Sequence, residues 1–117
     1  MNCLFCGMRD GSIEVKKIDE NPYAFAIYDI HPAAKSHVLV IPKKHCKDIL
    51  ELNQNGDCAD TYLGIFQLVE GVVKKTGISE SGFRLVVNAG PDASQSVFHL
   101  HFHVLGGQKL QASVNPV

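Results

Sequence analysis

QSVFHLHFHVLGG, residues 95–107, contains three of the six histidines of this 117-residue chain. Apolar residues alternate with these histidines, and paired glycines follow them. A strict period of two is typical of a half-buried strand, in which alternate side chains point to opposite faces. The pattern predicts a core-facing side made of Phe98, Leu100, Phe102 and Val104, and an opposite side that carries a row of imidazoles, His99, His101 and His103.

The row of imidazoles favours chemistry over a purely structural role. Alternate residues of a strand are about 6.5 Å apart, so the outer histidines are about 13 Å apart and the row is a poor three-ligand metal site. Near neutral pH an imidazole can act as a nucleophile, a proton donor and a partner for an anion, which suits reactions at phosphorus. His101, in the centre of the row, is the predicted nucleophile.

Three segments resemble a known family. The run HLHFHVL resembles the histidine-triad (HIT) family, and with Gly106 and Gly107 it resembles the nucleotide-binding, Gly-Gly branch of that family. YDIHPAAKSHVLVIPKKH, residues 28–45, is similar to a second signature, and FRLVVNAG, residues 83–90, extends the match. The resemblance covers residues 28–107 and is to a zinc-binding, bacterial-type member.

Composition bounds the remaining possibilities. A chain of 117 residues predicts a single domain spanning residues 1–117. The net charge of -1 and the absence of tryptophan argue against a nucleic-acid surface. No apolar run reaches transmembrane length and no signal peptide is visible, so we expect a cytoplasmic protein without a membrane partner.

Cys3 and Cys6 form a C-x-x-C pair, which in a reducing compartment is more typical of a metal or redox site than of a structural disulfide. The residues before Cys3 do not read as the strand that a redox pair would follow, so zinc is the favoured interpretation. His45 and His99 are the candidate remaining ligands, and free thiols beside two structural histidines are the alternative. The resemblance implies the same two histidines. A Cys2His2 set leaves no open position for water, so the zinc would be structural.

The rest of the chain predicts an α+β fold. Residues 13–18 and 23–27 read as a hairpin, residues 37–41 as a third strand and residues 83–88 as a fourth. Helices are expected over residues 45–52 and about 60–76. Gly64 and Gly71 in the longer helix would let a second backbone approach, so a dimer helix and a core helix both fit. We expect an antiparallel sheet of about five strands with one long and one short helix, and the resemblance implies a homodimer.

Asp29 follows directly after a predicted strand. A carboxylate at this point can accept the hydroxyls of a ribose, or it can cap a turn. The resemblance favours the ribose contact. It also implies that Ile30 lies against the base and that His37 supports the triad from behind.

The resemblance further implies how a purine mononucleotide, or its amides and esters, would be bound and cleaved. His101 would attack the α-phosphorus while the backbone carbonyl of His99 holds its ring, and Ser96 would help the leaving group depart. The expected donors to the phosphate are His103, Asn88, Ser94 and Gln95. For Asn88 and Ser96, ordinary turn chemistry is the alternative.

The expected function is therefore hydrolysis of nucleoside phosphoramidates or related mononucleotide esters through a nucleotidyl-histidine. One alternative is a dinucleoside polyphosphate hydrolase, although in that branch proline and arginine typically follow the triad instead of Gly106 and Gly107. Another is a zinc-stabilised nucleotide-binding module with little turnover. Residues 111–117 lack the His-Trp tail that is frequent in the Gly-Gly branch, so the resemblance does not fix the leaving group.

Overall fold

The computed structural model describes residues 3–112, and its centre is an antiparallel sheet of five strands in the order β1-β2-β3-β5-β4. The strands are β1 (Asp19–Glu20), β2 (Ala24–Tyr28), β3 (Ser36–Pro42), β4 (Phe83–Val87) and β5 (Phe102–Gly106). The helices of this part of the chain are α1 (Leu4–Asp10), α2 (Ile49–Leu52), α3 (Cys58–Lys75) and the 3-10 helix η1 (Pro91–Ala93). The predicted α+β class and the five antiparallel strands are confirmed.

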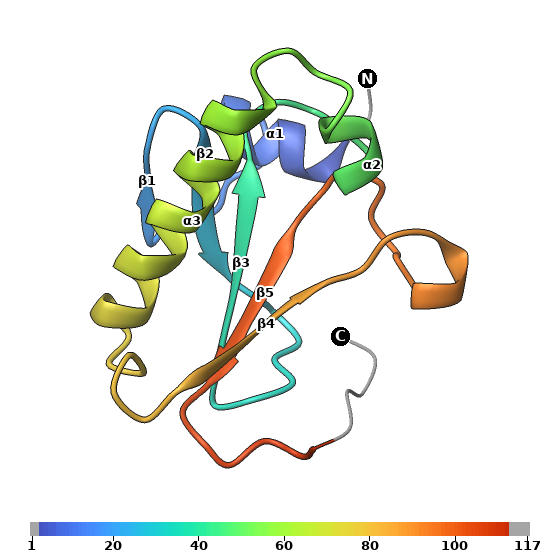
Figure 1. Cartoon of the computed structure of the whole chain (residues 1–117). Coiled ribbons are helices and arrows are strands. Elements are labelled where there is room, and N and C mark those ends of the chain that lie inside the picture. Colours follow the sequence, from blue (N-terminus) through green and yellow to red (C-terminus); the bar gives the residue numbers. More distant parts are fainter. Residues whose placement is uncertain (1–2, 113–117) are drawn as a thin grey trace.

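Helix α3 covers one face of the sheet, and α1 lies against the other (Figure 1). The α3 face includes Val38, Val40 and Val104, whereas Phe5 of α1 packs with Leu39 and Ile41 on the opposite face. Strands β2 and β3 are therefore buried on both faces. Their sequences, AFAIY and SHVLVIP, accordingly carry apolar residues on both faces.

Strand β5 lies between β3 and β4, where its side chains have neighbours on both sides. His103 is paired with Leu39 of β3 and with Val86 of β4. The strand ends at Gly106, and Gly107 follows with a φ of 80°, which a residue with a Cβ adopts only under strain. The pairing of His103 with Leu39, which packs with Phe5, places this histidine inside the sheet on the α1 side.

The triad strand is shorter than predicted. Strand β5 begins at Phe102, and Phe98 is 59% exposed, so the prediction that Phe98 faces the core is wrong. Leu100, by contrast, is fully buried as predicted. The ladder does not reach this far because the Leu100 N–H donates to the carbonyl oxygen of Cys46 at 2.7 Å. The residues before Phe102 are thus held by loops instead of by neighbouring strands.

Two other predicted boundaries are wrong. The first strand of the hairpin is β1, Asp19–Glu20, and not residues 13–18, because the Ile13 N–H donates to the carbonyl oxygen of Gly7 at 3.0 Å and draws this segment back along α1. The short helix α2 begins after Asp48, whose carboxylate caps it by accepting the Glu51 N–H at 3.0 Å. It therefore starts later than the predicted His45.

The glycines of α3 do not require a second chain. A Cβ on Gly64 would lie 2.5 Å from the Cβ of Tyr23, so this glycine lets the β1–β2 hairpin pack closely on α3. A Cβ on Gly71 would lie 3.4 Å from a carboxylate oxygen of Asp19, in the same hairpin. The atoms nearest to these glycines are side-chain atoms of the same chain, so the packing of the hairpin accounts for both glycines and the core-helix alternative fits them.

Candidate active site

The predicted site residues meet at a cavity of about 260 Å³ on the α1 side of the sheet. It lies between the end of β2, the loop around η1 and the start of β5. The predicted residues that line it are Asp29, Ile30, Asn88, Ser94, Gln95, Ser96, His101 and His103. His37 lies behind this set and contacts His103. Residues that are far apart in the sequence thus form one site.

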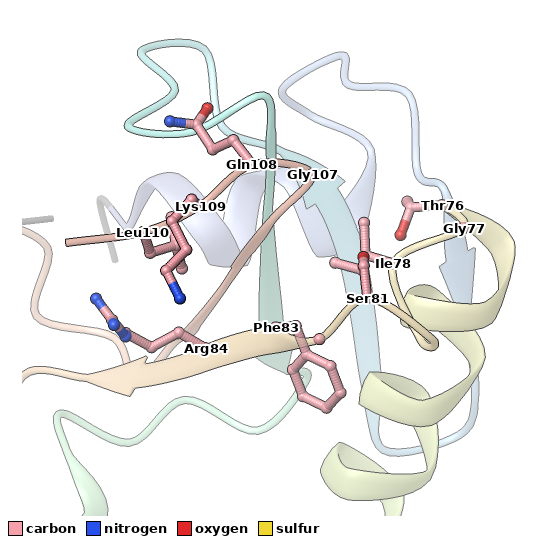
Figure 2. Close-up of a pocket in the computed structure, with 11 residues that line it drawn as sticks. Thr76, Gly77, Ile78, Ser81, Phe83, Arg84, Gly107, Gln108, Lys109 and Leu110 are labelled. Carbon is pink, nitrogen blue, oxygen red and sulfur yellow. The ribbon is translucent and has the colours of Figure 1, made fainter. Parts of the chain in front are cut away.

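A larger cavity of about 690 Å³ lies at the other end of β5, around Gly107 (Figure 2). Arg84 and Lys109 are among its lining residues, but none of the predicted site residues is. Because it offers neither an imidazole nor a thiol, the smaller cavity is the candidate active site.

His101 is held as a neutral imidazole with one free nitrogen. Its Nδ1 donates to the backbone carbonyl oxygen of His99 at 2.8 Å. A carbonyl can only accept, so Nδ1 carries the proton and Nε2 keeps its lone pair. Burial lowers the pKa of His101, which favours this neutral form. His101 is 8% exposed and His103 is 4% exposed, so the histidine side of the triad segment, predicted as the open side of a half-buried strand, is buried as well.

His103 is held in the opposite tautomer by a chain of hydrogen bonds. The Ala33 N–H donates to His37 Nδ1 at 2.9 Å, so the proton of a neutral His37 sits on Nε2. His37 Nε2 lies 2.9 Å from His103 Nδ1, which must then accept. The proton of His103 is thereby placed on Nε2. This Nε2 is buried and has no hydrogen-bond partner within residues 3–112, so it is a donor available to a bound anion.

Lowering the pH toward 4 should destabilise the fold, because His103 is buried as a neutral ring. Burial lowers the pKa of His103 to about 4, with further lowering by His101 and His37 and an opposing effect of Asp29. In the unfolded chain the pKa of a histidine is about 6.5. Between these two values the unfolded state binds the proton and the folded state does not, so the free energy of unfolding falls as the pH drops. His103 alone should contribute on the order of 3 kcal/mol to this loss.

Denaturant unfolding at about pH 7 and about pH 4.5 measures this effect. The variant His103→Gln should lose less stability between the two pH values than the wild type. His31→Gln, which changes an exposed histidine at the same cavity, is the matched control and should behave like the wild type. Equal losses in the wild type and in His103→Gln would contradict the assignment of a neutral buried ring.

Asp29 caps the turn after β2, and its carboxylate also lines the cavity. Its Oδ1 accepts the His31 N–H at 2.8 Å, which is a turn contact. Its Oδ2 lies 3.4 Å from His37 Nε2. The turn therefore fixes the direction of a carboxylate that also lines the cavity.

The loop that contains Ser94, Gln95 and Ser96 lies at the cavity with different side-chain exposures. Ser94 and Ser96 are exposed, whereas Gln95 is buried. Both amide hydrogens of Gln95 go to backbone carbonyls, to Lys47 at 2.7 Å and to Val97 at 3.1 Å, and its Oε1 accepts the Gly90 N–H at 2.9 Å. In this arrangement Gln95 has no hydrogen left for a phosphate. It braces the loop instead.

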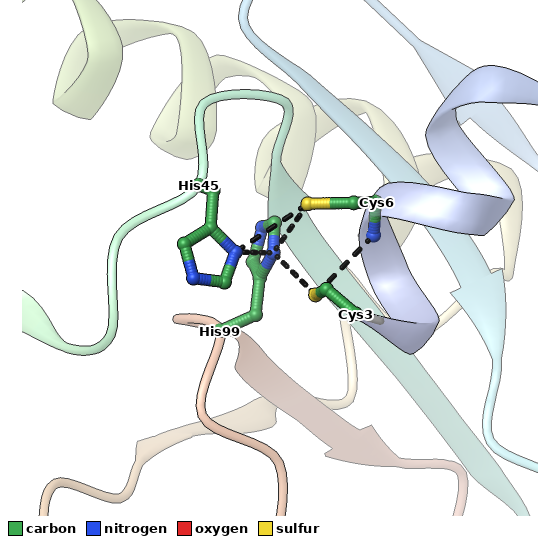
Figure 3. Close-up of side chains that lie close together, drawn as sticks. All are labelled: Cys3, Cys6, His45 and His99. Atoms are coloured by element: carbon green, nitrogen blue, oxygen red, sulfur yellow. Dashed lines mark hydrogen bonds between the residues drawn. The ribbon is translucent and has the colours of Figure 1, made fainter. Parts of the chain in front are cut away.

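A second cluster lies beside the cavity and can hold a metal ion. Cys3, Cys6, His45 and His99 each direct one ligand atom to a common point, with all four atoms within 4.8 Å of one another (Figure 3). His99 Nδ1 is 3.3 Å from Cys3 Sγ, 3.6 Å from Cys6 Sγ and 3.1 Å from His45 Nδ1. In a tetrahedral zinc site, sulfur and nitrogen ligands are separated by about 3.4 to 3.6 Å. The observed spacings fit this arrangement.

The chemistry of these groups also suits a metal ion. His99 Nε2 donates to the carbonyl oxygen of Pro42 at 2.8 Å, so the lone pair lies on Nδ1, toward the two cysteines. Burial lowers the pKa of His99 to about 4, which keeps that nitrogen unprotonated. Burial and the neighbouring Cys3 raise the pKa of the Cys6 thiol, so a thiolate there needs a cation beside it. The ring of His99 thus faces the other candidate metal ligands, while its backbone carbonyl contacts His101.

Sequence reasoning missed the contribution of α1. Leu4, Phe5 and Met8 of this helix line the cavity. The Phe5 ring stands edge-on to His99 and His101, with centroid distances of 5.7 and 5.2 Å. The left-handed Gly11 after Arg9 and Asp10 was an available stop signal for a short helix.

An antiparallel sheet of five strands with two imidazoles, His101 and His103, at one cavity is the arrangement expected of a histidine-triad fold. The HIT domain family matches residues 10–110, and the chain belongs to this family. It is 42% identical over 99 residues to an uncharacterized HIT-like protein of Helicobacter pylori, which covers 85% of this chain and 90% of that relative.

Solved structures agree with this assignment. A HIT family hydrolase from Clostridium thermocellum superposes with a TM-score of 0.90 at 38% identity, covering 97% of each chain. A HIT family hydrolase from Legionella pneumophila gives a TM-score of 0.88 at 36% identity, covering 95% of this chain and 97% of that one. A histidine triad nucleotide-binding protein from Candida albicans gives a TM-score of 0.79 at 28% identity, covering 97% and 87%. These likenesses support a hydrolase. None of the helices between residues 3 and 112 has both the length and the apolarity needed to cross a membrane.

Proposed function

We propose that this protein is a purine nucleotide-binding hydrolase of the Gly-Gly branch, acting at the α-phosphorus of nucleoside phosphoramidates or related mononucleotide esters. One observation carries the proposal. The 2.8 Å hydrogen bond from His101 Nδ1 to the His99 carbonyl leaves Nε2 unprotonated on a side chain that lines the cavity. A neutral imidazole nitrogen is the form that attacks phosphorus.

In the first step, His101 Nε2 attacks the α-phosphorus. A bond forms between Nε2 and phosphorus, and the bond from phosphorus to the leaving nitrogen or oxygen breaks. The leaving group keeps the electron pair and takes up a proton, for which the hydroxyl of Ser96 at the cavity is the candidate relay from solvent. The ring becomes cationic because Nδ1 keeps its proton. The His99 carbonyl, already in contact with that proton, stabilises the charge.

In the second step, water attacks the phosphorus of nucleotidyl-His101. The bond between Nε2 and phosphorus breaks, the nucleoside monophosphate leaves, and the water releases one proton. His101 returns to its starting tautomer. In both steps, a negatively charged phosphate oxygen can accept a hydrogen bond from the unpartnered Nε2–H of His103.

The remaining cavity residues suit the rest of a nucleotide. Asp29 is the candidate acceptor for the ribose hydroxyls, and Asn88 and Ser94 are candidate phosphate contacts. Ile30 is 86% exposed at the cavity, and an exposed apolar side chain there is suited to lie against a purine base. Leu4 of α1 lines the same cavity and adds to this apolar surface.

A substrate screen tests the proposal. Adenosine and guanosine phosphoramidates should be hydrolysed to the monophosphate and an amine, faster than dinucleoside polyphosphates of the same base. Preferential cleavage of the dinucleoside compounds would move the protein to the other branch. Tight binding of adenosine monophosphate without turnover of any of these compounds would make it a binding module and overturn the proposal.

We also propose that the metal held by Cys3, Cys6, His45 and His99 is zinc and that it is structural. Two thiolates and two imidazoles in a tetrahedral arrangement are a set that zinc prefers, and they fill its coordination. None of the four side chains lines the active-site cavity. The metal would therefore join α1 to the loop after β3 and to the loop before β5, without taking part in the reaction.

We further propose that residues 1–117 form one HIT domain that pairs as a homodimer through α3 and β4. Leu63 and Phe66 on α3 and Phe83 on β4 are 58%, 48% and 43% exposed, and together they line an apolar hollow of about 500 Å³. Strand β4 is also an edge of the sheet (Figure 1). An apolar surface beside an open edge strand is typical of a protein interface.

Replacing Leu63 by glutamate should convert the dimer to a monomer, because it would bury a charge between the two copies. Sedimentation equilibrium measures the change. Leu50→Glu is the matched control, since Leu50 is 65% exposed on α2, and it should remain dimeric. A monomeric wild type, or equal behaviour of the two variants, would contradict this interface.

A further inference from the structure

Asp29 lies at a junction between the cavity and the histidine pair behind it. Its Oδ1 accepts a hydrogen bond from the His31 N–H at 2.8 Å, and this contact fixes the orientation of the carboxylate. Its Oδ2 lies 3.4 Å from His37 Nε2, the same nitrogen that faces His103 Nδ1 at 2.9 Å. The His37 side chain is 2% exposed, so solvent does not compete for these contacts.

Both neighbours of His37 specify one tautomer. On one side of the ring, the Ala33 N–H at 2.9 Å can only donate, so Nδ1 must be free of a proton. On the other side, a carboxylate oxygen can only accept, so a proton on Nε2 is favoured there. The Asp29 carboxylate and the Ala33 amide therefore favour the same tautomer of His37, with the proton on Nε2, although they lie at different ends of the turn after β2.

The tautomer of His37 determines that of His103. If Nε2 of His37 carries the proton, His103 Nδ1 has to accept, and the proton of His103 moves to its buried, unpartnered Nε2. If His37 were in the other tautomer, His103 would carry its proton on Nδ1. It would then present a lone pair to the cavity, where a phosphate oxygen would be repelled instead of bound.

We infer that Asp29 is a positioning residue for the reaction: through His37 it makes His103 a hydrogen-bond donor to the substrate phosphate. This inference rests on the proposed function and adds to it. The carboxylate proposed to bind the ribose is also the one that orients the donor at the phosphate. Loss of the carboxylate should therefore slow the chemical step, and not only weaken nucleotide binding.

The first test needs no substrate. In metal-loaded protein with ¹⁵N-labelled histidine, two-bond ¹H–¹⁵N correlation spectra should show His37 and His103 both protonated on Nε2. Asp29→Asn keeps an oxygen for the His31 N–H but places an amide beside His37. It should shift both rings toward a mixture of tautomers. Asp60→Asn, an exposed carboxyl on α3, is the control and should leave both spectra unchanged.

The second test is a double-mutant cycle on the rate of nucleotidyl-His101 formation at saturating substrate in a single turnover. Asp29→Asn should slow this step by about tenfold or more. His37→Phe should slow it as well, and combining Asp29→Asn with His37→Phe should have no further effect on the rate. Thermal unfolding of each variant checks that the fold is retained.

Each outcome decides the inference. Unchanged histidine spectra in Asp29→Asn, or rate effects that simply multiply in the double variant, would mean that Asp29 acts on the ribose alone and would overturn it. Shifted spectra in a protein that turns over no nucleotide would overturn the proposed function while the positioning role of Asp29 stands. Turnover of nucleotide together with unchanged spectra in Asp29→Asn would support the proposed function and overturn the positioning role of Asp29.

Discussion

Replacing His101 by alanine should lower kcat/KM for a nucleoside phosphoramidate by on the order of 10⁴-fold or more, because no other group in the cavity replaces the nucleophile. His103 cannot take over, since its cavity-facing Nε2 carries the proton. Rapid quenching of the wild-type reaction, followed by peptide mapping, should locate the nucleotide on His101. The alanine variant should give no such adduct.

A structural effect has to be separated from a catalytic one. His101 is buried against the Phe5 ring, so alanine removes packing as well as the nucleophile. Its thermal unfolding should be compared with that of Phe5→Leu, which alters the same contact but keeps the imidazole. Phe5→Leu should retain most of the rate of adduct formation. Activity of His101→Ala within tenfold of the wild type, or an adduct on another residue, would mean that the mechanism is wrong.

The period of two in the sequence correctly predicted a strand at the triad, but it did not predict where this strand begins. The alternation from Leu100 to Val104 places the apolar residues toward α3 because the pleat of a strand enforces it. Phe98 continues the same alternation in the sequence but is exposed. The difference comes from the Leu100 N–H, which pairs with Cys46, a residue far away in the chain. A local pattern cannot show that a distant loop takes over a hydrogen bond.

The wall of the cavity was less predictable than its histidines. Phe5 contacts both His99 and His101, yet α1 is a helix of seven residues with little signal of its own. Isolated helices of this length are not stable in water, so tertiary contacts decide whether it forms. The Cys3–Cys6 spacing predicted a zinc site in this segment. It did not show that the apolar residues between and after the cysteines reach the active site.

Roles that depend on hydrogen direction could not be read from residue types. The resemblance implies that Gln95 donates to phosphate, but its amide is fully used by the backbone of the loop around it. Conversely, the donor character of His103 follows from the Ala33 N–H, which any residue except proline would provide. The sequence therefore identified which side chains meet, whereas the three-dimensional network assigns the direction of their hydrogen bonds.

Removing the metal should lower the thermal midpoint by roughly 10 °C or more, because Cys3 and Cys6 would tie α1 to His45 and His99 through it, in addition to the packing of Phe5. Cys3 caps this helix with its Sγ, which lies 3.5 Å from the Cys6 N–H, and both sulfurs face His99. Without a cation, two thiols and two imidazoles would face one another with no ion between them, and Cys6 and His99 would do so while buried. Metal analysis of protein purified without added metal should find about one zinc per chain.

The variant with Cys3→Ser and Cys6→Ser should lose this zinc and unfold at the lower temperature even when zinc is supplied. Cys58→Ser is the matched control, since Cys58 is a free cysteine outside the cluster, and it should keep both the zinc and the midpoint. Chelation should reduce thermal stability more than it reduces nucleotidyl transfer to His101 in the molecules that remain folded, because no ligand side chain lines the cavity. A native protein without metal would contradict the structural zinc site, as would immediate loss of the chemical step on chelation while the circular dichroism of the fold persists.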